Sequence, residues 1–211
     1  MTQDEIAELL RPFLGDSFIS PQQLQQVSDY LDLLLKWNAR INLTAVRRPA
    51  EILQRHFGES FFAARHLLAA EASETSAIDF GSGAGFPGLP LKIWALGLNL
   101  TLVESNQKKV AFLREAARLL KLDDVEVLPV RAENVNAAAD LVTLRAVERF
   151  ENILPTALRL VSPGGTLALL IGEAQEKLAL KIVEGVNWGS PIAIPGSRSR
   201  VLLVGRLTPA K

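Results

Sequence analysis

The chain has 211 residues, of which 48% are hydrophobic and 22% are charged, so it can bury one good core and carry a small additional lobe. Cysteine is absent, which excludes a disulfide framework and thiolate metal sites, and two histidines are too few for a typical zinc site. The formal net charge is zero, which argues against indiscriminate nucleic-acid binding. The composition therefore predicts a soluble globular protein without a metal centre.

No apolar run approaches the length of a membrane span, and Met1 to Phe13 is acidic and amphipathic where a signal peptide would be basic and then apolar. We therefore expect a cytoplasmic protein with no membrane partner. Residues 77–211 carry 16 basic and 13 acidic side chains, whereas residues 1–76 carry 7 and 10. A local basic face can still hold a few phosphates, so the composition leaves RNA open as a partner.

The first 76 residues predict a helical extension. Apolar residues recur at helical spacing in residues 4–14 and, after Pro21, in a second and longer helix. The polar run Trp37 to Thr44 is typical of a turn that ends a helix or, alternatively, of part of a site. A third helix is expected from Pro49 to Phe61. Within it, His56 by itself is more typical of a hydrogen-bonded structural residue than of a catalyst.

The segment Ala77 to Gly88 is typical of a strand that runs into a glycine-rich turn and then a helix. Gly81, Gly83 and Gly85 allow positive φ and leave no Cβ between the main chain and a ligand. Pro87 lacks an N–H and suits a first helical turn, so the helix N-terminus would face the ligand. The segment predicts a cofactor that lies against the backbone.

Two cofactors compete for this turn, since Gly83, Gly85 and Gly88 also satisfy the dinucleotide fingerprint G-x-G-x-x-G. Asp79 favours S-adenosylmethionine, because a carboxylate at the mouth of the strand attracts the methionine ammonium and disfavours a pyrophosphate. Glu104 ends the next apolar run and is placed to accept hydrogen bonds from both ribose hydroxyls of either cofactor. The pattern favours S-adenosylmethionine over a dinucleotide and over a glycine-rich turn without a ligand.

In the second half, strands and helices alternate at an interval that implies right-handed βαβ units and a parallel sheet. Ligands of such sheets lie at the carboxyl ends of the strands. This rule gathers four features around one cleft: Asp79, Glu104, the turn Arg131 to Asn134 and the strand end at Arg145.

Short strands at Pro191 to Ile194 and Val201 to Val204 predict a terminal antiparallel hairpin, which by analogy is more typical of methyltransferases than of dehydrogenases. We expect an α/β fold of the Rossmann-like class I methyltransferase type, with a mostly parallel central sheet and helices on both faces. This core would occupy residues 77–211, and residues 1–76 would pack on it in a single globular unit.

A series of short motifs resembles one family. In chain order the motifs are Leu35-Lys36-Trp37-Asn38, Asn42-Leu43-Thr44, Arg55-His56, Glu59-Ser60, Asp79 to Gly88, Lys108-Lys109 with Phe112-Leu113, Arg131 to Glu133, and Arg145-Ala146. The chain is similar to the RsmG family, also called GidB, bacterial methyltransferases that modify N7 of one guanine in small-subunit ribosomal RNA. Because the match runs from about Leu31 to Val204, it is more specific than the glycine turn alone.

The resemblance implies that Gly81 and Phe86 line S-adenosylmethionine, that Glu104 holds its ribose, and that Arg145 lies at the mouth of the cleft. The full set of expected cofactor-binding residues is Asp79, Gly81, Gly83, Phe86, Glu104, Ala132, Glu133 and Arg145, with Ala132 and Glu133 at the adenine edge. Two positions depart from the family's usual pattern. Glu59 stands in place of an aspartate, and Ile171 stands in place of a lysine, which removes a cation.

Guanine N7 exposes a lone pair and carries no proton, so methylation there needs no dedicated base and positioning should dominate. The catalytic candidates are His56, Glu59 and Arg145, in positioning or electrostatic roles. A carboxylate such as Glu59 would stabilise the cationic product. Alternatively, His56 and Glu59, one helical turn apart, merely pair on a surface.

The implied partner is 16S ribosomal RNA or the small ribosomal subunit, bound by a monomer. The candidates for phosphate contacts are Arg47, Arg48, Arg55, Arg145, Arg198 and Arg200, each of which could instead be a solvated surface charge. Two other functions stay open. One is a methyltransferase acting on a small molecule or protein, which the neutral charge and Ile171 mildly favour. The other is a non-catalytic nucleotide-binding protein of the same fold.

Overall fold

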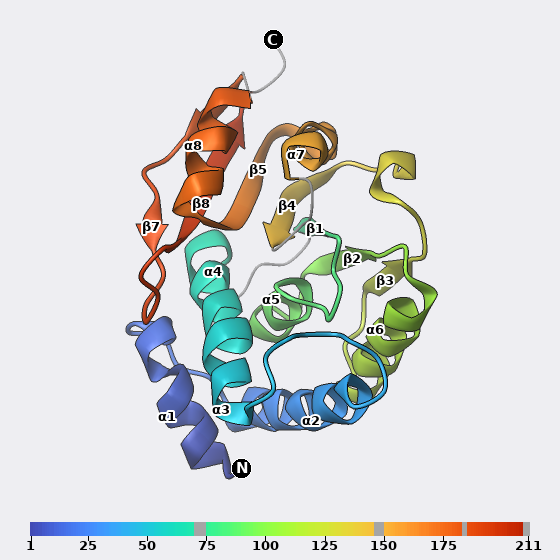
Figure 1. Ribbon diagram of the computed structural model, residues 1–211, viewed down its shortest axis with the longest axis vertical. Coiled ribbons are helices and arrows are strands. Elements are labelled where there is room, and N and C mark those ends of the chain that lie inside the picture. The colour runs from blue at the N-terminus through green and yellow to red at the C-terminus, as the bar shows by residue number, and fades with distance from the viewer. Residues whose placement is uncertain (70–74, 146–149, 183–184, 209–211) are drawn as a thin grey trace.

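The computed structural model describes residues 1–69, 75–145, 150–182 and 185–208. Its strands are β1 (Ser76–Phe80), β2 (Asn99–Val103), β3 (Val125–Leu128), β4 (Ala139–Arg145), β5 (Val161–Gly172), β6 (Val186–Trp188), β7 (Ile192–Ala193) and β8 (Arg200–Leu207). They form one sheet in the order β3-β2-β1-β4-β5-β8-β6, and β7 pairs with β8 beside this path (Figure 1). The pairs among β1 to β5 are parallel, whereas β8 is antiparallel to its three neighbours. The predicted mostly parallel sheet is confirmed.

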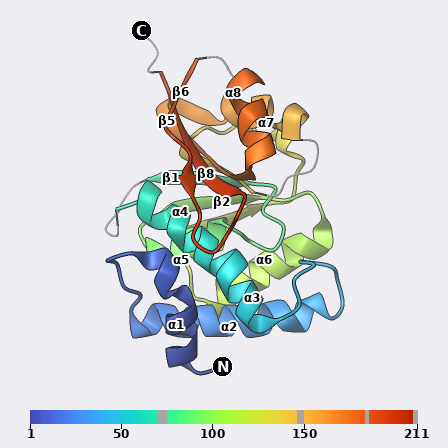
Figure 2. The same cartoon turned by 60° about the vertical axis from the view of Figure 1, so that its left-hand side comes forward.

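Helices cover both faces of the sheet. They are α1 (Gln3–Leu14), α2 (Pro21–Asn38), α3 (Pro49–Ile52), α4 (Glu59–Leu67), α5 (Gly88–Trp94), α6 (Gln107–Leu119), α7 (Phe150–Arg159) and α8 (Glu173–Ile182). Successive strand residues enter two different apolar clusters, as Leu141 and Val142 do, because side chains alternate across a strand. One cluster includes α5, α6 and the N-terminal helices, and the other includes α7 and α8 (Figures 1 and 2).

The N-terminal helices begin where capping residues direct them. Ser20 accepts a hydrogen bond from the main chain of Gln23, whose side chain in turn accepts one from Ser20 N, and Pro21 opens α2. Residues of α1 and α2 belong to the same buried cluster as α5 and α6. The extension thus shares its apolar core with one face of the sheet.

The predicted third helix contains a wider turn. A π-helical segment, η1 (Leu53–Gly58), joins α3 to α4. Gly58 packs so closely on α1 that a Cβ there would lie 2.5 Å from the Phe13 ring. Single π-turns within helices are frequent at functional sites, and this one carries His56 just before Glu59.

The C-terminal region is more extensive than the sequence predicted. The expected hairpin corresponds to β7 and β8, but β8 also pairs with β5 over seven residues and with β6, and neither β6 nor α8 was predicted. The glycine-containing turn Ser162 to Gly165 lies inside β5 as an irregularity, since Ala139 pairs with Val161 and Leu141 with Thr166.

Candidate active site

The glycine turn after β1 adopts the conformation that its residues predict. Gly81, Gly83 and Gly85 have φ values of 69°, 57° and 84°. A Cβ on Gly85 would lie 2.4 Å from the Tyr30 hydroxyl oxygen, so this glycine is required by internal packing. At Gly83, the nearest described atom to a Cβ would be the Gly81 carbonyl oxygen at 3.7 Å. The backbone at Gly83 is therefore open to a ligand.

Asp79 lies beneath this turn and is 1% exposed. One carboxylate oxygen accepts a hydrogen bond from the Thr143 hydroxyl at 2.7 Å, and the other accepts one from Gly88 N at 3.2 Å. Burial raises the pKa of Asp79 to about 6, and these two hydrogen bonds oppose the increase. The carboxylate thus lies at the end of β1 and below the turn, tied to the first residue of α5.

Glu104 follows β2 and is 8% exposed. Its two oxygens accept hydrogen bonds from Gly83 N at 3.0 Å and Asn106 N at 2.8 Å. A carboxylate oxygen can accept more than one hydrogen bond, so Glu104 keeps capacity for ribose hydroxyls while it fixes the turn. An open backbone at Gly83, this acceptor and the buried anion Asp79 fit S-adenosylmethionine better than a pyrophosphate.

Arg145, at the end of β4, brings the catalytic candidates together. Its Nη2 donates to Glu59 Oε2 at 3.1 Å, to His56 Nδ1 at 2.9 Å and to the Arg55 carbonyl at 2.5 Å. The side chains of Arg145 and Glu59 are only 7% and 4% exposed. His56 and Glu59 therefore do not merely pair with each other on a surface; both bind a buried guanidinium.

His56 is held as a neutral ring. Because Arg145 can only donate, Nδ1 is the acceptor and the ring hydrogen is on Nε2, which donates to Thr44 Oγ1 at 2.7 Å. Burial and the positive charge of Arg145 lower the pKa of His56 to about 3. Burial also lowers the pKa of Arg145 to about 10, opposed by Glu59, so Arg145 stays charged at neutral pH. His56 is not available as a base near neutrality.

The polar run Trp37 to Thr44 satisfies both interpretations of its sequence. It ends α2, because the Asn38 side chain accepts hydrogen bonds from Leu43 N and Thr44 N. It also reaches the site through the Thr44 hydroxyl.

Phe86 connects the glycine turn to this cluster. Its ring stacks on Tyr30 with centroids 5.2 Å apart, and it meets the His56 ring at 5.1 Å. The Arg145 guanidinium carbon lies 5.9 Å from its centroid. Phe86 is 7% exposed, so most of the ring supports the turn from inside.

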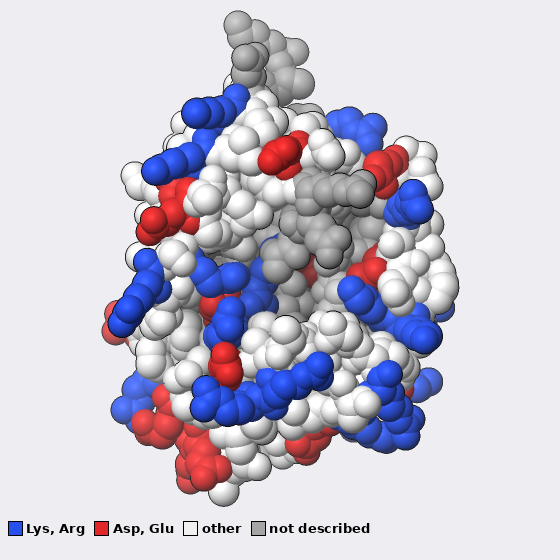
Figure 3. All heavy atoms as spheres, viewed as in Figure 1, with Lys and Arg blue, Asp and Glu red and all other residues white. Residues whose placement is uncertain are grey.

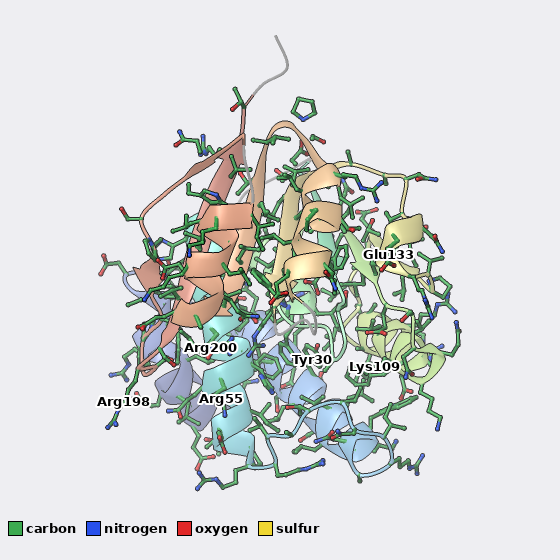
Figure 4. The ribbon with its side chains drawn as sticks, turned by 45° about the horizontal axis from the view of Figure 1, so that its top comes forward. Tyr30, Arg55, Lys109, Glu133, Arg198 and Arg200 are labelled. Carbon is green, nitrogen blue, oxygen red and sulfur yellow. The ribbon has the colours of Figure 1, made fainter. Side chains whose placement is uncertain are left out.

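Lysine and arginine side chains, drawn in blue, gather beside the hollow on the face seen in Figure 3. A groove of about 540 Å³ between α1, η1 and the β7–β8 turn is lined by Arg55, Arg198 and Arg200 together with Glu59 (Figure 4). Arg200 Nη2 lies 2.9 Å from Glu59 Oε2 and its side chain is 24% exposed, so Arg200 is not a solvated surface charge. Arg198 is exposed.

The remaining candidate arginines are exposed and have local partners. Arg48 and Arg55 both pair with Glu51, at 3.5 and 3.4 Å. Arg47 donates to the Asn38 carbonyl and the Asn42 side chain. Local pairs of this kind are weak and can yield to phosphate.

The adenine-edge candidates lie in a short 3-10 turn, η2 (Ala132–Asn134), after β3. Glu133 is exposed, on the opposite side from Arg198 in Figure 4. Ile171, where the family usually has lysine, is buried in the apolar cluster of α7 and α8. The next residue, Gly172, pairs with Arg200 in the β5–β8 ladder, which places a cation beside the position that lost one.

Two residues of the site were not predicted. Thr143 donates to Asp79, and Tyr30 donates to the Ala84 carbonyl at 2.5 Å. Threonine is common in strands and tyrosine fits an apolar helix face, so residue type alone gave little indication. The available signal was a hydroxyl in an otherwise apolar, buried pattern.

Two general findings concern the part of the chain that the structure describes. There, no cluster of three or more metal-ligating side chains is placed to hold an ion. None of the helices described is both long and apolar enough to cross a membrane.

The sheet order and the glycine turn above Asp79 and Glu104 define a Rossmann-like methyltransferase that uses S-adenosylmethionine. The family model GidB, described as rRNA small subunit methyltransferase G, matches residues 23–184. The protein named ribosomal RNA small subunit methyltransferase G from Chloroflexus aggregans is 40% identical over 199 residues, which cover 88% of this chain and 82% of the relative. Its namesake from Roseiflexus castenholzii is 38% identical over 199 residues, with 88% and 84% covered. The chain belongs to this family.

Solved structures of lower identity agree on the fold. A SAM-dependent methyltransferase from Aquifex aeolicus has a TM-score of 0.60 at 16% identity, covering 75% of this chain and 93% of that chain. TYW2 from P. horikoshii, solved in complex with MeSAdo, has a TM-score of 0.60 at 17% identity, covering 74% and 63%.

Proposed function

We propose that this chain transfers the methyl group of S-adenosylmethionine to N7 of a guanine in 16S small-subunit ribosomal RNA, as a cytoplasmic monomer. The names of its relatives support the ribosomal RNA substrate. The observation that carries the N7 assignment is the neutral state of His56, with both ring nitrogens engaged next to the cofactor turn. A site whose central histidine cannot accept a proton suits an atom with a free lone pair.

The cofactor supplies an electrophilic methyl group when it is bound. The chain's part is to hold the sulfonium and the base in line, which the packed turn of Gly83 and Phe86 and the carboxylate of Glu104 support. Asp79 provides a negative charge beneath the turn for the methionine ammonium.

Glu59 takes a positioning role in this proposal instead of stabilising the cationic product directly. Its charge is already matched by Arg145 and Arg200. With His56 neutral, these residues carry one net positive charge, which suits a phosphate and not a positively charged ring. Arg145 and Arg200 would thus hold the backbone next to the target nucleotide.

The exposed arginines complete the proposed RNA surface. Arg198 and Arg55 line the groove beside Glu59, and Arg47 and Arg48 lie before α3 on the same N-terminal segment. Because the whole chain has no net charge, these contacts should be few and local.

The test is methylation with labelled S-adenosylmethionine, offered naked 16S RNA, small subunits and a no-RNA control. The modified base is then mapped by borohydride and aniline cleavage, which reports N7-methylguanine. The expected result is one N7-methylguanine in one of the RNA substrates. Methylation at an exocyclic amine or a ribose hydroxyl, where a proton must leave, would contradict the base-free mechanism. Cofactor binding without transfer to either RNA would contradict the proposal and leave the two alternatives, a methyltransferase acting on a small molecule or protein and a non-catalytic protein of the same fold.

A further inference from the structure

Helix α2 packs against the core and the glycine turn, and one of its faces carries polar side chains that bond to both. Gln23, Gln26 and Tyr30 are spaced by three and four residues, so they lie on the same side of the helix. Gln23 donates to the Ile93 carbonyl and Gln26 to the Leu120 carbonyl, both at 2.8 Å. These acceptors lie at the ends of α5 and α6, where helix carbonyls lack partners of their own. The two glutamines anchor α2 to the core.

Tyr30 extends this row of anchors to the cofactor turn. Its side chain is fully buried, and its hydroxyl donates to the Ala84 carbonyl at 2.5 Å. Burial raises the pKa of Tyr30 well above its usual value of 10, so the hydroxyl stays protonated and remains a donor.

The turn is fitted to this hydroxyl from both sides of Ala84. Gly85 approaches it so closely that a Cβ would lie 2.4 Å from the oxygen. Phe86 stacks on the Tyr30 ring with an interplanar angle of 6°. Three consecutive residues of the turn therefore rest on one side chain of the extension. Gly83, which immediately precedes Ala84, is the residue whose backbone is open to the ligand.

We propose that Tyr30 is a positioning residue that holds the turn in its cofactor-binding conformation, so that α2 sets the affinity for S-adenosylmethionine. The inference rests on the proposed function only in taking this turn as the S-adenosylmethionine site. Without the hydroxyl, the Ala84 carbonyl is left unpaired and glycines at positive φ sample other conformations, which lowers the fraction of molecules ready to bind.

Tyr30→Phe removes the hydroxyl and keeps the ring. Gln26→Met is the matched control, because it removes a buried hydrogen bond from the same helix face to a carbonyl away from the turn. Calorimetry with S-adenosylhomocysteine and no RNA, well below both melting temperatures, should give about tenfold weaker binding for Tyr30→Phe and unchanged binding for Gln26→Met. The KM for S-adenosylmethionine should rise in proportion while kcat stays the same.

Equal losses of melting temperature with unchanged affinity in both variants would overturn the proposal and leave Tyr30 a packing residue. A second measurement needs no substitution, since Tyr30 is the only tyrosine in the chain. Its single Cζ resonance in protein labelled with [13Cζ]tyrosine should shift when S-adenosylhomocysteine is added, and an unmoved resonance would also contradict the proposal. The calorimetric and NMR results do not depend on RNA, so a wrong RNA substrate would affect only the kinetic and methylation measurements.

Discussion

The two halves of the site are built in different ways. On the cofactor side, Asp79, Glu104 and Tyr30 are buried, and each has a fixed hydrogen-bond partner in or next to the glycine turn. On the proposed RNA side, the arginines are exposed and extend from separate segments. Arg55 has only a weak local pair with Glu51, and Arg198 lies in the turn between β7 and β8. Affinity for the cofactor should thus depend on exact geometry, and affinity for RNA on charge.

The largest expected effect is that of Gly83→Val on the cofactor side. A branched Cβ at φ 57° strains the turn and fills the space where the backbone is open, so we expect at least about 100-fold weaker S-adenosylhomocysteine binding with most of the helical signal retained. Calorimetry and circular dichroism measure the two quantities. Gly196→Val is the control, because Gly196 has φ 72° and an open surrounding in the β7–β8 turn. Retained affinity in Gly83→Val would mean that the cofactor lies elsewhere.

The second prediction concerns Glu59, which lines the groove of the arginines but is as buried as the residues on the cofactor side. Glu59→Gln leaves the buried guanidinium of Arg145 without its counter-charge, which should lower the free energy of unfolding by about 3 kcal/mol and reduce turnover. Glu51→Gln removes a carboxylate from exposed pairs and should cost less than about 1 kcal/mol. Urea unfolding of both variants makes the comparison. Equal costs would show that burial of the Glu59 pair adds no stability.

The third prediction separates the two halves by pH. His56, with a pKa of about 3, stays neutral, so kcat should be flat between about pH 6 and pH 8, and His56→Asn should keep a flat profile at reduced rate. Asp79 has a pKa of about 6 and gains its proton as the pH falls, so cofactor affinity should fall up to about tenfold per unit below pH 6. Asp79→Asn should bind weakly with no such dependence. A kcat limb near pH 6.5 that vanishes in His56→Asn would make His56 a base.

The smallest effect concerns the exposed arginines. Each lost phosphate contact reduces the slope of log affinity against log salt by about one unit. The slope measured for RNA binding by Arg198→Ala should therefore be shallower by that amount. Arg200→Ala should change the slope by a similar amount, because it removes the one net positive charge of the Glu59 cluster, and should also lower stability, because Arg200 pairs with Glu59. Arg206, exposed near the far end of β8, provides the control. An unchanged slope for Arg198→Ala would mean that Arg198 is a solvated surface charge that does not contact a phosphate.

The sequence predicted the features that depend on neighbouring residues. Glycines after an apolar strand specify the turn, and alternation of strands and helices specifies the parallel sheet. Contacts between distant segments were not predictable. The pairing of Glu59 with Arg200 and the bond from Tyr30 to Ala84 depend on how elements pack, and the π-helical turn at Leu53 to Gly58 has the same apolar spacing as an ordinary helix. By residue type alone, His56 was expected to be a hydrogen-bonded structural residue, but its partner Arg145, at the end of β4, could not be identified from the sequence.

The place of β8 in the sheet affects how the site forms as the chain is made. This strand is the last in the sequence but lies between β5 and β6, and its first residue supplies the guanidinium that meets Glu59. A nascent chain folds from its N-terminus as it leaves the ribosome, so the helices and the glycine turn can assemble well before Arg200 emerges. The arginine cluster is therefore completed only after β8 has been made, and a nascent chain that lacks β8 would present the glycine turn without the contact between Arg200 and Glu59.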